Sequence, residues 1–173
     1  MASFADRVIG AARLRVETYE EVEHDVTATG QAAAVIALAS VAGGIGGYWL
    51  LGIVGIARGA LIALIGWVVA AVVLWFIGTK VMPGKQTEAD IGQLLRTVGF
   101  AGAPGLLRVL GVVPGLGLVS SIVAGVWTLV ATVVAVRVAL DYDDNVKAII
   151  ACLIALAVYF VVGALLASIL VWF

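Results

Sequence analysis

The chain has 173 residues, of which 64% are hydrophobic and 12% are charged, and its formal net charge at pH 7 is −1. A soluble domain has about 45–50% apolar and about 25% charged residues, so this composition excludes a single water-soluble core and indicates helices whose side chains face lipid. The weakly negative charge also argues against nucleic acid as a partner, because phosphates require a strongly basic face.

Residues 1–29 are predicted to form a cytoplasmic segment with one amphipathic helix over residues 3–26. Apolar side chains recur there at steps of three and four residues, while arginines and glutamates occupy the other faces. Charged residues begin at Asp6, so no secretory signal is expected. The helix could lie on the membrane surface, pack beneath the bundle or dock a partner, and its acidic second half favours packing or docking.

The same segment contains the only histidine of the chain, in the pattern Glu21-Val-Glu-His24. Di-iron carboxylate bundles use two such motifs and two further glutamates that project inward from four helices. Because one copy is present, Glu21 and His24 are weak metal candidates, and a solvated helix face is the preferred interpretation. We expect no cofactor and no catalytic residue, since Cys152 lies within an apolar run far from any base.

Uncharged stretches predict the membrane spans of an all-α, integral membrane helical bundle over residues 30–173. A helix rises 1.5 Å per residue and needs about 20 residues to cross a hydrocarbon core of about 30 Å. Four stretches of 21 to 32 residues lack formal charges and predict spans over residues 31–55, 59–79, 116–138 and 147–171. An inner amphipathic helix is expected over residues 87–96 with Thr87 as its N-cap, and Asp144 or Asn145 is expected to cap the last span.

The third segment is apolar but contains two arginines and two prolines between residues 94 and 117. One interpretation is a short span over residues 97–113, kinked at Pro104, in which Arg108 reaches the outer headgroups or contacts an anion or a lipid. The other is a re-entrant loop. With the N-terminus inside, five spans place eight Lys and Arg residues inside and two outside, whereas the re-entrant loop gives seven and three. The positive-inside rule therefore favours five spans narrowly.

Glycines at helical spacing predict close helix packing. Gly43 and Gly47 are four residues apart in the first span, and Gly99, Gly102 and Gly105 follow at three-residue steps in the third. Small residues let membrane helices approach closely. These contacts could form within one chain or with a partner, and the sequence leaves both alternatives open.

Two parts of the sequence carry a resemblance to a known family. They are EEVEHDVTATGQA, and LLRTVGFAGAPGLLRVLGVVPGLG with the following IVAGVWTLVATVVAVRVALDY. They resemble bacterial members of the Yip family of polytopic membrane proteins, which implies five spans in a prokaryotic inner membrane, a cytoplasmic N-terminus and a short outer C-terminus. Eukaryotic relatives interact with Rab-type GTPases, but this chain lacks their long cytoplasmic tail and its Tyr/Gly-containing motifs. Rab binding is therefore not carried over.

The sequence favours a non-enzymatic, multi-pass protein that acts as a scaffold or accessory subunit of a larger membrane complex through helix–helix packing. The expected partners are the lipid bilayer and either another membrane protein or a second copy of the chain. The alternative is a small transporter or channel, or a lipid-handling or membrane-shaping protein, that uses the Gly/Pro-rich third span. Coupled transport is less favoured, because none of the predicted spans contains an acidic residue or a histidine.

Overall fold

The computed structural model describes residues 2–85 and 87–170, and over these residues it contains seven α-helices and no strand. The α-helices are α1 (Phe4–Ala12), α2 (Val16–His24), α3 (Ala28–Gly46), α4 (Tyr48–Phe76), α5 (Ile91–Ala101), α6 (Gly117–Ala139) and α7 (Asn145–Leu170). A π-helical turn, η1 (Ile77–Val81), extends α4, and a 3-10 helix, η2 (Ala103–Val112), follows α5. The predicted all-α fold is confirmed.

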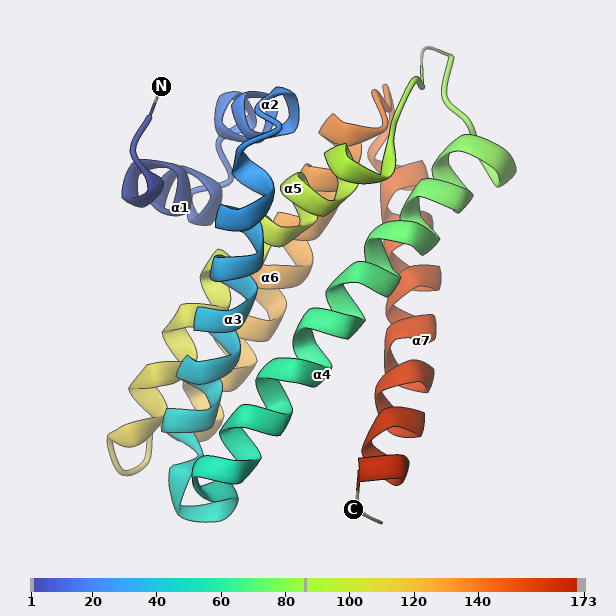
Figure 1. Cartoon of the computed structure of the whole chain (residues 1–173). Coiled ribbons are helices and arrows are strands. Elements are labelled where there is room, and N and C mark those ends of the chain that lie inside the picture. Colours follow the sequence, from blue (N-terminus) through green and yellow to red (C-terminus); the bar gives the residue numbers. More distant parts are fainter. Residues whose placement is uncertain (1, 86, 171–173) are drawn as a thin grey trace.

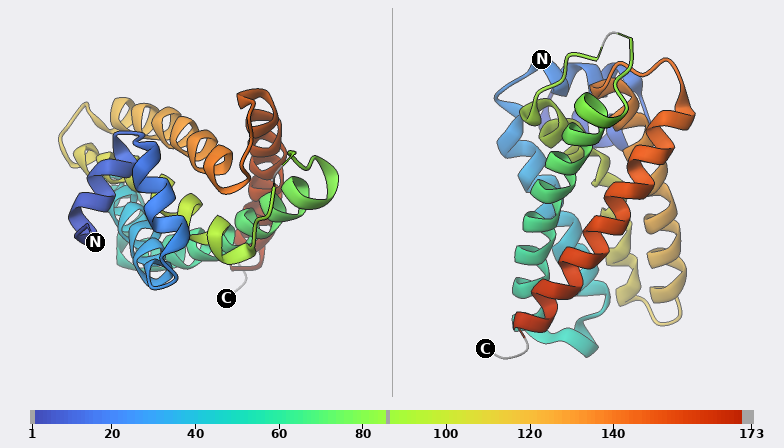
Figure 2. Two further views of the ribbon diagram at one scale, coloured as in Figure 1. Left: turned by 90° about the horizontal axis from the view of Figure 1, so that it is seen from above. Right: turned by 90° about the vertical axis from the view of Figure 1, so that its right-hand side faces the viewer.

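The long helices run alternately between two ends of an elongated bundle (Figures 1 and 2). α1, α2 and the α6–α7 loop gather at one end, which we term the N-terminal end, whereas the α3–α4 turn and the η2–α6 loop lie at the opposite end (Figure 1). Within the described residues, three helical segments are long and apolar enough to cross a membrane, namely Ala28–Gly46, Gly52–Val81 and Gly117–Ala139. The α5–η2 rod and α7 follow the same end-to-end course (Figure 1), and their crossing of the membrane stays a prediction.

The single amphipathic helix expected over residues 3–26 is wrong, because the chain forms two short helices there. Leu14 has a φ of 60°, a left-handed conformation that ends α1 and reverses the chain direction before α2. Gly10 permits the close return of the chain, since a Cβ at this position would collide with the side chain of Thr18. The acidic residues of α2 are thereby brought back towards α1.

The turn between the first two long helices lies earlier than the predicted spans 31–55 and 59–79 imply. α3 ends at Gly46, and Gly52, with φ 60° and ψ −179°, interrupts the start of α4. Arg58, which bounded both predicted spans, instead lies exposed within α4. A long arginine side chain near a helix end can extend to the membrane surface, so its charge does not require a turn.

The inner helix expected over residues 87–96 and the third span form one rod. α5 begins after Asp90, whose carboxylate accepts a hydrogen bond from Gln93 N at 2.8 Å while Asp90 N donates to Gln93 Oε1 at 2.7 Å. The predicted N-cap, Thr87, instead hydrogen-bonds across two loops. Pro104 stands at the start of η2, where the missing N–H is tolerated, so it begins a 3-10 helix instead of kinking one α-helix.

The last two helices agree with the sequence predictions over the described residues. α6 is displaced by one residue from the predicted span 116–138, and α7 begins two residues before the predicted 147. Position 171, where the last span was predicted to end, lies outside the described residues. The Asp144 carboxylate accepts a hydrogen bond from Val146 N at 2.8 Å, as expected for a cap at the start of α7.

Small side chains occupy much of the interfaces between the long helices, and many large apolar side chains face outward. Buried alanines line α3 and α6, among them Ala32, Ala39, Ala131 and Ala135. On the outside, Leu118 is 74% exposed and Leu153 is 60% exposed. The apolar outer surface suits contact with lipid tails. Inside the bundle, close packing of small residues holds membrane helices together.

Candidate functional site

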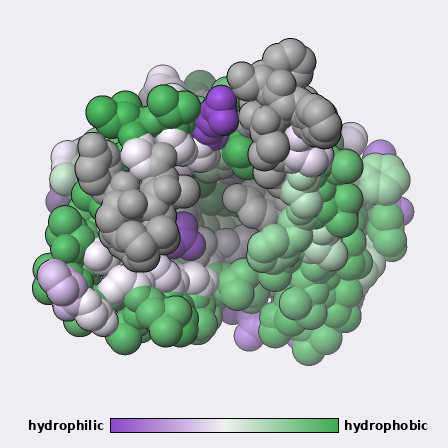
Figure 3. Space-filling model, turned by 90° about the horizontal axis from the view of Figure 1, so that it is seen from below, coloured by the Kyte–Doolittle hydropathy of each residue, from purple (hydrophilic) through white to green (hydrophobic). Residues whose placement is uncertain are grey.

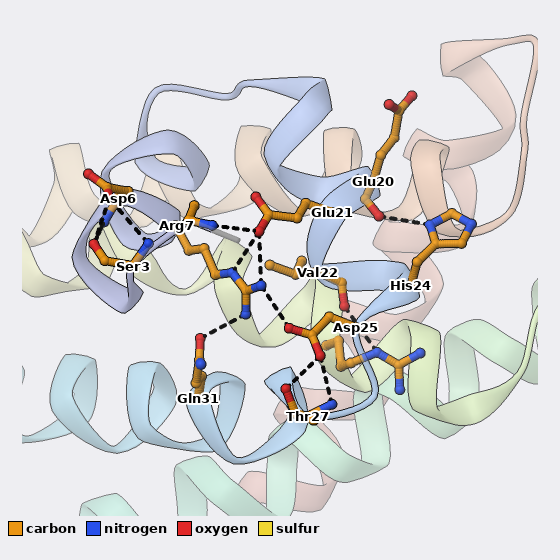
Figure 4. Close-up of polar contacts among 12 residues, drawn as sticks. Ser3, Asp6, Arg7, Glu20, Glu21, Val22, His24, Asp25, Thr27 and Gln31 are labelled. Carbon is orange, nitrogen blue, oxygen red and sulfur yellow. Dashed lines mark hydrogen bonds and ion pairs between the residues drawn. The ribbon is translucent and has the colours of Figure 1, made fainter.

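A buried arginine fixes α1 to α2 and α3 at the N-terminal end. Arg7 is only 2% exposed, and its Nη2 lies 2.9 Å from Glu21 Oε1 and 2.7 Å from Asp25 Oδ2, while Nη1 donates to Gln31 Oε1 at 3.2 Å (Figure 4). The two carboxylates compensate the buried charge. The hydrogen bond from Arg7 lowers the pKa of Glu21, and hydrogen bonds from Thr27 and then Arg7 lower the pKa of Asp25.

A second arginine fixes α2 to α5. Arg96 is 6% exposed, and its Nε donates to the carbonyl oxygens of Val22 at 3.0 Å and Glu23 at 2.9 Å. These carbonyls belong to the C-terminal turn of α2, where a cation satisfies free acceptors and stabilises the helix dipole. The Glu23 carboxylate accepts a hydrogen bond from Gln93 Nε2 at 3.1 Å, and burial raises the pKa of Glu23 to about 6.

The fixed α2 forms one wall of a hollow that we term the acidic basin. This cavity, of about 1210 Å³, lies between α2, the loop before α5, α6 and the α6–α7 loop. Arg7, Arg137 and His24 line it together with eight carboxylates, which are Glu17, Glu20, Glu21, Glu23, Asp25, Glu88, Asp141 and Asp143. Within residues 2–85 and 87–170, the only ion pairs join Arg7 to Glu21 and Asp25. The remaining carboxylates leave the basin with a negative potential that suits a cationic ligand.

The two weak metal candidates do not converge on a common point. Glu21 faces Arg7, whereas Nδ1 of His24 donates to the carbonyl oxygen of Glu20 in its own helix at 2.8 Å (Figure 4). Among the described residues, no group of three His, Cys, Asp or Glu side chains could hold a metal ion. Glu21 acts in this structure as the partner of a buried arginine.

The predicted glycines of the third segment pack on α3 within the chain. We term Gly99, Gly102 and Gly105 the glycine face. Cβ atoms added at these positions would stand 2.6 to 3.0 Å from side-chain atoms of three α3 residues, which are Ala32, Ile36 and Ala39. Gly43 is contacted by the Arg108 side chain, since an added Cβ would lie 3.4 Å from Arg108 Cδ. Gly47 lies at the α3–α4 turn and not on a helix face.

A second hollow, which we term the membrane cavity, lies between α3, α4, α5, η2, α6 and α7. It has a volume of about 650 Å³ and is lined mainly by small and apolar side chains. Figure 3 views the opposite end of the bundle and shows it hollowed between largely apolar surfaces. Four of the lining residues carry polar groups of interest, namely Ser40, Arg108, Thr128 and Thr132. Thr132 Oγ1 donates to the Thr128 carbonyl at 2.8 Å, whereas the buried Thr128 Oγ1 has no hydrogen-bond partner among the described residues.

Arg108 points into the bundle, contrary to the expectation that it reaches the outer headgroups. Its Nη1 lies 3.8 Å from the position of a Cβ added at Gly105, one turn closer to the N-terminal end. The reason is that helical side chains tilt towards the start of their helix, and η2 runs from the N-terminal end to the opposite end (Figure 1). No described residue accepts a hydrogen bond from the half-buried guanidinium or forms an ion pair with it.

Sequence reasoning singled out Arg108 and the glycine face but missed both hollows. The run of glutamates in α2 signalled half of the acidic basin, whereas Glu88, Asp141 and Asp143 are separated from it by more than sixty positions of sequence. The apolar residues around Arg108 gave no sign of a cavity, because the same types of apolar residue line cavities and fill cores. Only the packing of α4, α6 and α7 distinguishes them.

Comparisons with known proteins identify the family of the chain through one match. A search of the curated proteins and a search of the solved structures each found no match. The family model of the Yip1 domain matches residues 15–166. The match begins just before α2 and ends in α7, so it includes the membrane cavity, the glycine face and every lining residue of the acidic basin except Arg7. Because it covers most of the chain, the protein belongs to the Yip1 domain family.

Proposed function

We propose that this protein is a non-enzymatic scaffold or accessory subunit of a membrane complex, which docks a basic segment of a partner protein in its acidic basin. The observation that carries the proposal is the set of carboxylates in the basin that form no ion pair with any described residue. Five of them, Glu17, Glu20, Glu88, Asp141 and Asp143, are exposed. Lysine and arginine side chains are the chemical complement of such a surface.

The basin walls are held in place before any partner arrives. Arg7 joins α1, α2 and α3, and Arg96 joins α2 to α5. A surface that is already ordered loses less conformational entropy on binding, which favours affinity. This rigidity supports docking over a purely solvating role for the charged helix face.

The basin replaces the glycine face as the proposed docking surface. Gly99, Gly102 and Gly105 are covered by α3 within the chain, so they are not free to receive a helix of another protein. In this proposal the chain crosses a prokaryotic inner membrane five times, with the basin in the cytoplasm. The excess of lysine and arginine predicted on that side supports this orientation.

The test is partner retention after mild extraction into lipid nanodiscs, followed by native mass spectrometry. The double variant Glu20→Gln/Asp143→Asn removes two exposed basin charges without altering the side-chain contacts of Arg7 or Arg96. Asp144→Asn is a matched control, because it removes a neighbouring charge outside the basin and asparagine still caps a helix.

We expect a stoichiometric partner with wild type and with Asp144→Asn, lost in the double variant and at high salt, where exposed charges are screened. A protein extracted without any partner would contradict the proposal. If the double variant retains the partner as well as wild type does, the partner binds a surface other than the basin.

A further inference from the structure

We propose that the membrane cavity binds one anionic phospholipid, with the phosphate on Arg108 and an acyl chain between the helices. This inference is independent of partner docking, because the cavity and the acidic basin share no lining residue. It assigns a ligand class to the side chain that the sequence marked as an anion or lipid contact.

The size and lining of the cavity match a site for a mainly apolar ligand. Its volume of about 650 Å³ falls within the range of about 300–1,000 Å³ that is typical of small-molecule pockets, which are mostly apolar with a few polar groups. Its walls come near the backbone at small residues, including Ala39, Gly44, Gly55 and Gly59. Among helices that face lipid, an acyl chain is the apolar occupant at hand, whereas water would find few hydrogen-bond partners.

Arg108 supplies the anion-binding end of the site. Four residues of η2 follow it, and at about 2.0 Å per residue in a 3-10 helix they place its Cα about 8 Å from the end of that helix. Gly43 accommodates the arginine stem, and the guanidinium has no acceptor among the described residues. A charge in apolar surroundings is costly unless it is paired. The five N–H donors of a guanidinium match the geometry of a phosphate group.

Only an amphipathic anion uses both parts of the site. Free phosphate would pair with Arg108 but leave the apolar walls empty. A neutral lipid would fill the walls but leave the guanidinium unpaired. An anionic phospholipid such as phosphatidylglycerol meets both requirements, so it is the occupant to test.

Two variants separate the headgroup contact from the acyl-chain contact. Arg108→Gln removes the cation, with Arg58→Gln as a control because Arg58 is an exposed arginine outside the cavity lining. Gly125→Leu fills the cavity from α6, where a Cβ meets no atom within 4 Å, and it should not disturb the fold. Gly30→Leu is its control, since Gly30 is equally open, exposed and outside the cavity lining.

The measurement is binding to delipidated protein in detergent, followed by native mass spectrometry and thermal unfolding. Phosphatidylglycerol, phosphatidylcholine and inorganic phosphate are added separately. We expect one phosphatidylglycerol per chain with a raised melting temperature, at least tenfold weaker binding in Arg108→Gln, and no binding in Gly125→Leu. The apo form of Gly125→Leu should melt no lower than wild type. Both control variants should bind as wild type does.

Three results would overturn the inference. If phosphatidylcholine binds as tightly as phosphatidylglycerol, the headgroup is not selected by the arginine. If inorganic phosphate protects as well as the lipid, the site is an anion site alone. If Gly125→Leu still binds the lipid, the acyl chain is not in the cavity. Should Arg108→Gln fail to fold, the Gly125→Leu variant and the comparison of the three ligands on wild type decide the question.

Discussion

Replacing Gly99 by alanine should destabilise the protein, although alanine normally stabilises a helix relative to glycine. α5 approaches α3 so closely that an added Cβ would stand 2.6 Å from Ala32 Cβ and 3.2 Å from the Ala32 carbonyl carbon. The backbone atom cannot rotate away, so the two helices must separate. Overpacking of this kind costs about 1–3 kcal/mol, whereas helix propensity contributes a gain of about 1 kcal/mol. Because the opposing group includes backbone, we expect the upper part of the overpacking range and a net loss of up to about 2 kcal/mol.

The same substitution at Gly125 should have the opposite sign. A Cβ there meets no atom within 4 Å, so only the helix propensity changes and stability should rise by up to about 1 kcal/mol. A second control combines Gly99→Ala with Ala32→Gly, which removes the opposing methyl group. Residues in contact usually show a coupling of about 0.5–3 kcal/mol, so the double variant should lose less stability than the sum of its single changes.

The assay is reversible unfolding in mixed micelles with increasing denaturing detergent, followed by tryptophan fluorescence. Trp67 reports on this interface, because its indole Nε1 donates to the Leu95 carbonyl at 3.0 Å and lies 3.1 Å from the position of a Cβ on Gly99. If Gly99→Ala unfolds at the same detergent fraction as wild type, or at a higher one, the spacing of α3 and α5 does not depend on glycine and the reasoning fails.

Three further predictions concern the N-terminal end and the topology. Arg96→Met leaves the α2 carbonyls without a donor, so it should lower the free energy of unfolding by about 2–4 kcal/mol and speed hydrogen exchange in α2. The control Arg137→Met, at an exposed arginine, should have neither effect. Unchanged exchange in Arg96→Met would show that Arg96 does not hold α2 against α5. Because burial raises the pKa of Glu23 from 4.5 to about 6, the folded state binds its proton more tightly than the unfolded state. Stability should therefore increase by up to about 2 kcal/mol as the pH falls through this range, a rise that Glu23→Gln should abolish in denaturation series at each pH. In a background lacking the native cysteine, five spans predict that an impermeant thiol reagent labels Leu116→Cys from outside and Asp143→Cys only after permeabilisation, whereas a re-entrant third segment predicts the reverse.

Composition and local spacing were sufficient to predict that this is a helical membrane protein and to locate its last two helices. Lipid contact depends on the length and polarity of each apolar run, which are local properties. α6 and α7 therefore begin within two residues of their predicted starts. The glycine face could also be found from spacing, because a helix places every third or fourth residue on one side. Its partner could not, since the choice between α3 and another chain is a tertiary one.

Only the tertiary structure decided where the chain breaks and what meets in space. Leu14 and Gly52 adopt positive φ angles that the pattern of charges and prolines does not predict. Arg58 lies within α4, although its charge predicted a boundary between two spans. The acidic basin joins residues that are distant in sequence, and the direction of Arg108 follows from the course of η2 through the bundle. Burial and pairing are set by neighbours that a linear pattern does not identify. For this reason the sequence by itself indicates a membrane protein, whereas both hollows depend on the tertiary structure.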